Sequence, residues 1–171
     1  YGPVPLLQKE YEQDTPTDEL QLPRSTVDEC FNYIVAQLKE AQNEGLLENA
    51  SSDAVSGLGR IDKAIAQAFI IEALTYRASW LFNGECNYYA NLANEDGTKL
   101  FPAAPDQQTI KANWQKVVTE CQTFLTTYGT RYQLMYTNKD GKDVTDPDAN
   151  GNDPYESYPR AIRTHLNAIT N

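Results

Sequence analysis

Three stretches of the chain repeat apolar side chains at intervals of three and four residues, the spacing of helices with one buried face. The first begins after Thr26, which forms the sequence signature of a capping box with Glu29. Its apolar positions then recur until Gly45, at Val27, Cys30, Phe31, Ile34, Val35, Leu38 and Ala41. The pattern predicts an amphipathic helix that starts at the Thr26 cap and ends before Gly45.

The second stretch, residues 59–84, opens with Gly59-Arg60 and is apolar nearly all round. Its apolar residues are Ala64, Ile65, Ala66, Ala68, Phe69, Ile70, Ile71, Ala73, Leu74, Tyr76 and Ala78. Only Lys63, Gln67, Glu72 and Arg77 interrupt them strongly, so no wide solvent face is left. We therefore expect one long helix, capped by Asp62 or the residues before it, covered on several sides and ended by Asn83-Gly84.

A third helix is predicted before Gly129, and a fourth, weaker one at the end of the chain. The third carries Trp114, Val117, Val118, Cys121, Phe124, Leu125 and Tyr128. The fourth carries Tyr158, Ala161, Ile162, His165, Leu166 and Ile169. Strand signals are sparse, and the best of them is residues 131–136.

The connections between these helices are long. Residues 1–24 hold four prolines and suit an extended segment, and residues 83–105 combine Asn-Gly, Asp-Gly and two prolines, with one short helical turn expected near Tyr88. Trp114, Val117, Val118 and Cys121 have the spacing of the first helix of a tetratricopeptide repeat, and so do Phe31, Ile34, Val35 and Leu38. Residues 31 and 114 lie 83 positions apart, however, against a period of roughly 34 residues.

The expected fold class is therefore all-α, with irregular tetratricopeptide-like helical repeats and long loop insertions. We expect a single helical domain over residues 1–171. It comprises an extended leading segment (1–24), a helical core (25–134), an acidic loop (135–156) and a final helix (157–171).

Composition narrows the possible functions. The chain carries 24 acidic and 14 basic residues, a formal charge of -10, which disfavours nucleic acid and anionic lipid as partners. No run reaches the roughly 20 apolar residues that cross a bilayer. His165 is the only histidine, which excludes histidine-dependent triads and multi-histidine metal sites within this chain, and we expect it to pack. Cys30, Cys86 and Cys121 have no metal-ligand spacing, and Cys30 and Cys121, on apolar helix faces, are interpreted as small buried hydrophobic residues.

A set of short motifs along the chain resembles the SusD/RagB family in order and spacing. The set begins with residues 1–5 (Tyr-Gly-Pro-Val-Pro), 24–30 (Arg-Ser-Thr-Val-Asp-Glu-Cys), Gly59-Arg60 with Lys63, and 81–84 (Leu-Phe-Asn-Gly). It continues with Tyr88-Tyr89, Asp96-Gly97, Leu100-Phe101-Pro102 and Trp114. No single element is unusual, but the ordered set is specific and extends to about residue 134.

The resemblance implies an internal piece of the tetratricopeptide-like part of a glycan-binding lipoprotein of the bacterial outer membrane. Such a protein binds oligosaccharides at the cell surface without catalysis and delivers them to a TonB-dependent, SusC-like transporter. Its lipid anchor would lie outside this chain. The alternative is a tetratricopeptide-like scaffold whose groove binds a protein segment. No enzyme activity is predicted, because no carboxylate pair stands in a recognisable apolar frame.

The resemblance names no glycan-binding residue here, so the aromatic residues are interpreted one by one. Trp80 and Trp114 fall on apolar helix faces and are expected in the core. The loop tyrosines are expected to anchor loops, although any of their rings would suit sugar stacking if exposed: Tyr88, Tyr89, Tyr132, Tyr136, Tyr155 and Tyr158. Arg60 is expected to tie neighbouring loops through its guanidinium group.

The acidic loop contains the sharpest local motif. Asp146, Asp148, Asn150 and Asn152, with Gly151 between the last two, match the first seven positions of a calcium-binding loop. The twelfth position holds Ser157 where the motif needs a bidentate acid, although Glu156 is adjacent. Two interpretations stay open: a solvated polar turn, which the displaced acid favours, and a calcium site formed by these residues.

Overall fold

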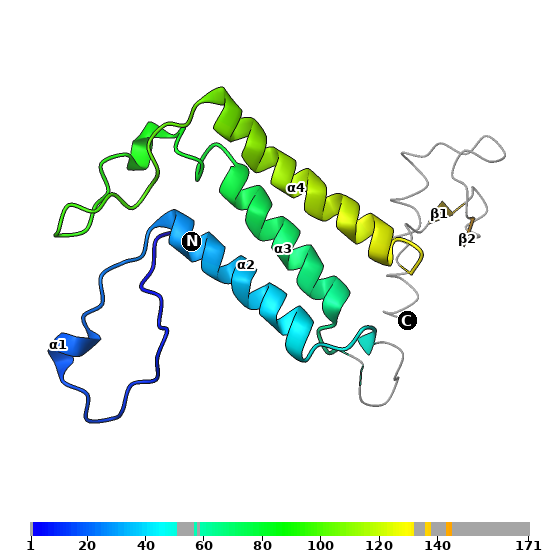
Figure 1. Cartoon of the computed structure of the whole chain (residues 1–171), viewed down its shortest axis with the longest axis horizontal. Coiled ribbons are helices and arrows are strands. Elements are labelled where there is room, and N and C mark those ends of the chain that lie inside the picture. The colour runs from blue at the N-terminus through cyan, green and yellow to red at the C-terminus, as the bar shows by residue number, and fades with distance from the viewer. Residues whose placement is uncertain (1, 51–56, 58, 132–135, 138–142, 145–171) are drawn as a thin grey trace. The chain divides into compact units, whose positions relative to one another are not determined.

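The computed structural model describes residues 2–50, 57, 59–131, 136–137 and 143–144 (Figure 1). The chain divides into two compact units, Tyr1–Thr127 and Tyr128–Asn171. The helices are α1 (Thr17–Leu20), α2 (Val27–Glu44), α3 (Lys63–Ala78) and α4 (Gln107–Tyr128), with the 3-10 turn η2 at Asn87–Tyr89. Two-residue strands, β1 (Tyr136–Thr137) and β2 (Asp143–Val144), pair antiparallel in the second unit. The all-α prediction is confirmed.

The start of α2 follows its sequence signature. The Thr26 hydroxyl accepts a hydrogen bond from the Glu29 amide at 3.2 Å, and the Glu29 carboxylate accepts one from the Thr26 amide at 2.7 Å. The bond from the Thr26 amide is the largest of the effects that lower the pKa of Glu29. The helix ends before Gly45, as predicted. The reciprocal cap satisfies donors that the first turn of any helix leaves unpaired.

The start of α3 was predicted correctly, but its end was not. The Asp62 carboxylate accepts the Ile65 amide at 3.0 Å, so Asp62 is the cap. The helix stops at Ala78 because Ser79 takes an extended conformation and its hydroxyl donates to the Tyr76 carbonyl at 2.6 Å. Asn83 is buried beyond this point and its amide donates to the Ala78 carbonyl at 3.3 Å.

The three long helices lie alongside one another, with α3 antiparallel to α2 and α4 (Figure 1). The α2–α3 pair carries an ion pair between Asp28 and Arg77, and the Lys63 amide donates to the Leu47 carbonyl at 3.0 Å where the connection returns to α3. Residues 79–106 form the long insertion before α4. This succession of antiparallel helices with long connections agrees with the predicted fold class.

The insertion supplies most of the buried core at the start of α2. The core residues are Val27, Phe82, Leu100 and Phe101, with Phe31 and Leu92 packed against them. The Val27 amide donates to the Leu100 carbonyl at 2.9 Å, so the insertion is joined to the helix by backbone as well as by side chains. Gly84 has φ of +99°, and a Cβ there would lie 2.5 Å from the Ala103 carbonyl oxygen. Only glycine fits this close approach of the backbone.

Two predictions about burial were wrong. On α3 the buried residues are Ala64, Ala66, Gln67, Ile70, Ala73 and Ala78, whereas Phe69 is 48% and Tyr76 54% exposed, so one side of the helix is uncovered. Trp80 and Trp114, expected in the core, are 61% and 43% exposed. Trp80 follows the end of α3, and Trp114 lies on α4, one turn before the buried Val117. Periodicity shows that a face is apolar but not whether a neighbour covers it.

Candidate functional site

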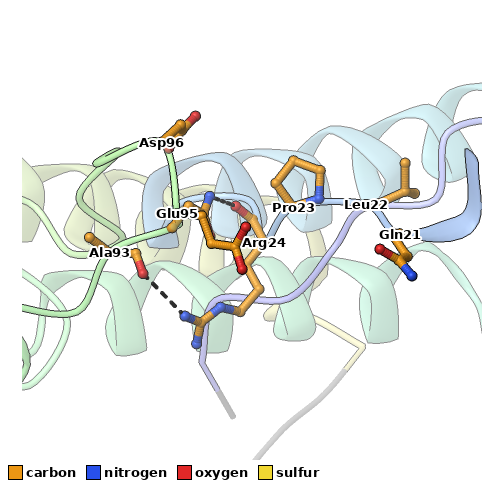
Figure 2. A pocket seen from close by; sticks show the side chains of 8 residues that line it. Gln21, Leu22, Pro23, Arg24, Ala93, Glu95 and Asp96 are labelled. Atoms are coloured by element: carbon orange, nitrogen blue, oxygen red, sulfur yellow. Dashed lines mark hydrogen bonds between the residues drawn. The ribbon is translucent and has the colours of Figure 1, made fainter. Parts of the chain in front are cut away.

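A cleft of about 470 Å³ opens between the segment that leads into α2 and the tip of the long insertion (Figure 2). One wall is residues 21–24 and the other is residues 93–96. Its lining residues are Gln21, Leu22, Pro23, Arg24, Ala93, Asn94, Glu95 and Asp96. Segments that lie about 70 positions apart in the sequence therefore meet at one surface site.

The wall formed by residues 93–96 is a tight, hydrogen-bonded turn. The Asn94 amide donates to the Thr98 carbonyl, and the Gly97 amide to the Asn94 carbonyl, both at 3.0 Å. Gly97 has φ of +87°, which suits glycine. The Thr98 amide donates to the Asp96 carboxylate at 2.9 Å, and this bond is the main cause that lowers the pKa of Asp96. The carboxylate is therefore held ionised as a hydrogen-bond acceptor.

The opposite wall is tied to this turn by two hydrogen bonds. The Asn94 side-chain amide donates to the Arg24 carbonyl at 2.8 Å, and the Arg24 guanidinium donates to the Ala93 carbonyl at a longer 3.5 Å (Figure 2). Within the described part of the chain, that carbonyl is the one acceptor that the Arg24 side chain reaches. Since a guanidinium group carries five N–H donors, most of them remain available to a ligand.

The cleft combines the groups that recognise a hydroxyl-rich ligand. Arg24 supplies donors, Glu95 and Asp96 supply carboxylate acceptors, and Gln21 supplies both. Leu22 and Pro23 add an apolar surface. Asp96 is poorly suited to act as a general acid, because its lowered pKa leaves it without a proton near neutral pH. The arrangement is suited to binding.

The insertion also presents aromatic rings, and of its tyrosines Tyr88 and Tyr89 only the second behaves as predicted. The Tyr89 ring stacks on Phe101 at 5.0 Å between centroids, so Tyr89 anchors the loop as expected. Tyr88 was expected to do the same, but it is 85% exposed and meets Tyr89 edge-on at 4.9 Å. Because Tyr89 holds it from one side, the Tyr88 ring is presented to solvent on a packed loop.

The remaining predicted residues fall into four groups. Cys30 is a buried free thiol, as interpreted, whereas Cys121 is only half-buried; Cys86 is also a buried free thiol. Arg60 is exposed and donates no side-chain hydrogen bond to a described residue, so the loop-tying role predicted for it is not seen there. Tyr136 begins β1. The calcium candidates Asp146, Asp148, Asn150, Asn152 and Glu156 lie outside the described residues, together with the final helix, His165, Tyr132, Tyr155 and Tyr158.

Over the described ranges, no three His, Cys, Asp or Glu side chains gather as metal ligands would. None of the helices described here has the length and apolar character needed to span a bilayer. The cleft itself was not foreseen from the sequence. Its only signal was the Asp96-Gly97 turn, and nothing in the pattern pairs that turn with Arg24.

Comparison with known proteins relates the chain to a solved structure. No protein-family model matches it, and no curated protein matches it. The solved structure of BT4246 is 31% identical and superimposes with a TM-score of 0.67, over 82% of this chain and 23% of that one. The selenomethionine form of BT4246 gives 30% identity and a TM-score of 0.62, over 81% and 22%. The chain thus shares its fold with BT4246 and spans less than a quarter of that protein's length.

Proposed function

We propose that this chain is part of a SusD/RagB-type protein that binds oligosaccharides at the bacterial cell surface and passes them to a TonB-dependent transporter without chemical change. The ordered motifs from Tyr1 to Trp114 support the family assignment. The antiparallel helices and the long insertion agree with the tetratricopeptide-like architecture that the resemblance implies.

The observation that carries the binding role is the cleft between residues 21–24 and 93–96. Sugar hydroxyls both donate and accept hydrogen bonds, and the cleft offers Arg24 as donor and Glu95 and Asp96 as acceptors. A neutral glycan also loses less hydration free energy on leaving water than a charged ligand does. The exposed Tyr88 ring lies on the same insertion and has the surface that stacks on a sugar face.

The role in transport, the outer-membrane location and the lipid anchor belong to the same proposal and rest on the resemblance alone. So does the absence of catalysis. Calcium binding by Asp146, Asp148, Asn150, Asn152 and Glu156 of the acidic loop belongs to the proposal as well. Titration of calcium into metal-free protein tests this, because a real site gives heat and a higher melting temperature at millimolar ion.

The decisive experiment is a glycan array on the complete protein, followed by calorimetry with any glycan retained and chromatography of the glycan after long incubation. We expect weak binding and recovery of the intact glycan. Arg24→Ala should weaken the binding. Lys116→Ala, which replaces an exposed side chain of α4, is the control and should not weaken it. Retention of no glycan, or the release of shortened products, would contradict the proposal.

A protein-binding scaffold is the second candidate, favoured by one observation. The exposed side of α4 carries Trp114, Val118 and Leu125 at 43%, 44% and 67% exposure, on a single helix face. Such a stripe suits the apolar side of a peptide. A scaffold would retain a protein segment and no glycan, and Trp114→Ala would weaken that interaction.

A further inference from the structure

The charged side chains that line the cleft are unequal in number. Among the described residues, Arg24 is the one cation at the cleft, whereas Glu95 and Asp96 bring two carboxylates (Figure 2). Within the described part of the chain, Arg24 forms no ion pair with either carboxylate. The cleft therefore has an excess of negative charge, on a chain whose formal charge is -10.

Hydrogen bonds fix the two walls that carry these charges. The Asn94 side-chain amide donates to the Arg24 carbonyl at 2.8 Å, and the Arg24 guanidinium donates to the Ala93 carbonyl at 3.5 Å. The two acidic residues follow Asn94 directly, in the turn that the bond from the Gly97 amide to the Asn94 carbonyl closes. The fold thus sets the arrangement of charges before a ligand arrives.

A glycan that carries a carboxylate or a sulfate meets one attraction and two repulsions in this cleft. Arg24 attracts the acidic group, Glu95 and Asp96 repel it, and the charge of the whole chain adds a repulsion at longer range. A neutral oligosaccharide forms hydrogen bonds with the same three side chains and meets no net repulsion. The ammonium group of an amino sugar is attracted by both carboxylates, so the cleft discriminates against negative charge alone.

Glu95 is the carboxylate that is free to meet a ligand. It is exposed, and its side chain forms no hydrogen bond or ion pair with a described residue. Asp96, by contrast, accepts a hydrogen bond from the Thr98 amide at 2.9 Å and so contributes to the shape of the turn. Removing the charge of Glu95 should therefore change the electrostatic potential of the cleft and leave its shape intact.

We propose that the cleft selects glycans by charge: it binds neutral oligosaccharides and disfavours those that carry carboxylate or sulfate groups, and Glu95 sets this preference. The inference rests on the proposed glycan-binding role and adds the class of glycan to it. Because these charges lie at the surface, where water and salt screen them, each one changes the affinity several-fold and not by orders of magnitude.

A glycan array on the complete protein tests the preference when it pairs neutral oligosaccharides with uronic-acid and sulfated counterparts on the same backbones. We expect the unchanged protein to retain the neutral member of a pair several-fold better. Glu95→Gln should narrow this gap by about 2- to 5-fold, the size of one unit charge roughly 4 Å away in water, at an unchanged melting temperature. Added salt should narrow the gap in the unchanged protein and leave the retention of neutral glycans as it was.

Glu44→Gln is the matched control, because it removes the same charge at the opposite end of α2 from Arg24 and should leave the gap unchanged. Equal narrowing by Glu44→Gln would assign the preference to the net charge of the chain and overturn the inference. Equal or better retention of the acidic glycans, or a gap that Glu95→Gln does not narrow, also overturns it, while retained neutral glycans still support the binding role. An array that retains no glycan overturns the proposed function and this inference with it.

Discussion

The side-chain amide of Gln67 on α3 donates a hydrogen bond of 2.7 Å to the carboxylate of Glu120 on α4. Gln67 is 5% exposed and also accepts a bond from the Gln42 amide at 3.2 Å, while Glu120 pairs with Lys39 at 2.8 Å. One buried amide thus joins α3 to both of its neighbours. A buried polar group is stable only when it is hydrogen-bonded, so this contact selects a single register for the three helices.

Replacing Gln67 should destabilise the helical unit. Gln67→Leu keeps the size of the side chain but leaves the Gln42 amide and the Glu120 carboxylate without this partner, at a cost of about 1–3 kcal/mol. Urea denaturation followed by circular dichroism measures the loss. Gln122→Leu, on the exposed side of α4, is the control and should change little. Equal stability of the two variants would show that the network contributes nothing.

The stability of the unit should depend on pH through Glu120. Burial raises the pKa of Glu120, but the hydrogen bonds from Lys39 and Gln67 and the charge of Lys39 together outweigh it, so the pKa lies below 4.5. A carboxyl group whose pKa is lower in the folded than in the unfolded protein stabilises the fold at pH values above its unfolded-state pKa. That stabilisation is lost as the pH falls through its folded-state pKa.

Glu120→Gln should therefore lower the free energy of unfolding most above about pH 5, and the difference from the unchanged protein should shrink as pH falls below 4.5. Urea titrations across this range measure it. Glu44→Gln, at the exposed end of α2, should show no such trend. A difference between Glu120→Gln and the unchanged protein that grows toward acid pH would refute the assignment.

Gly84 should tolerate alanine less well than Gly97 does. Both have positive φ, +99° and +87°, so a Cβ strains either backbone by about 1–2 kcal/mol. At Gly84 the new Cβ would also lie 2.5 Å from the Ala103 carbonyl oxygen, whereas nothing lies within 4 Å at Gly97. Thermal melts of Gly84→Ala and Gly97→Ala should show the larger loss at Gly84. A larger loss of melting temperature for Gly97→Ala would mean that the backbone at residues 102–103 moves away from the new Cβ at position 84 without a cost in free energy.

Tyr88 and Tyr89 should respond in opposite ways to alanine. Tyr88→Ala removes an exposed ring, so it should weaken glycan binding by about 2- to 10-fold, the size of one aromatic contact, with an unchanged melting temperature. Tyr89→Ala removes the ring stacked on Phe101 and should lower the melting temperature. Calorimetry with a retained glycan and thermal melts separate the two effects. A Tyr88→Ala variant that binds normally would place the sugar elsewhere.

The sequence alone determined where α2 and α3 begin and which residues give the helices an apolar face. It did not predict α1 (Thr17–Leu20), which lies in the segment expected to be extended. Thr26 and Glu29 lie three positions apart, as do Asp62 and Ile65, and the contacts between them form within one turn. Such interactions need no other part of the chain, so the caps and the helical period can be predicted from local spacing. The all-α class follows from the same local information.

The tertiary structure alone decided which apolar faces are covered, where α3 stops and how the cleft forms. Phe69 on α3 and Trp114 on α4 follow the helical spacing, and so do Ile70 on α3 and Val117 on α4. Only Ile70 and Val117 are buried. The Ala78 carbonyl is capped by Asn83 because the insertion turns back at Gly84, and Arg24 meets Ala93 across 69 positions of sequence. These contacts join residues that are distant in the sequence. Periodicity along a chain shows that a helix face is apolar, but it does not show which other element covers that face.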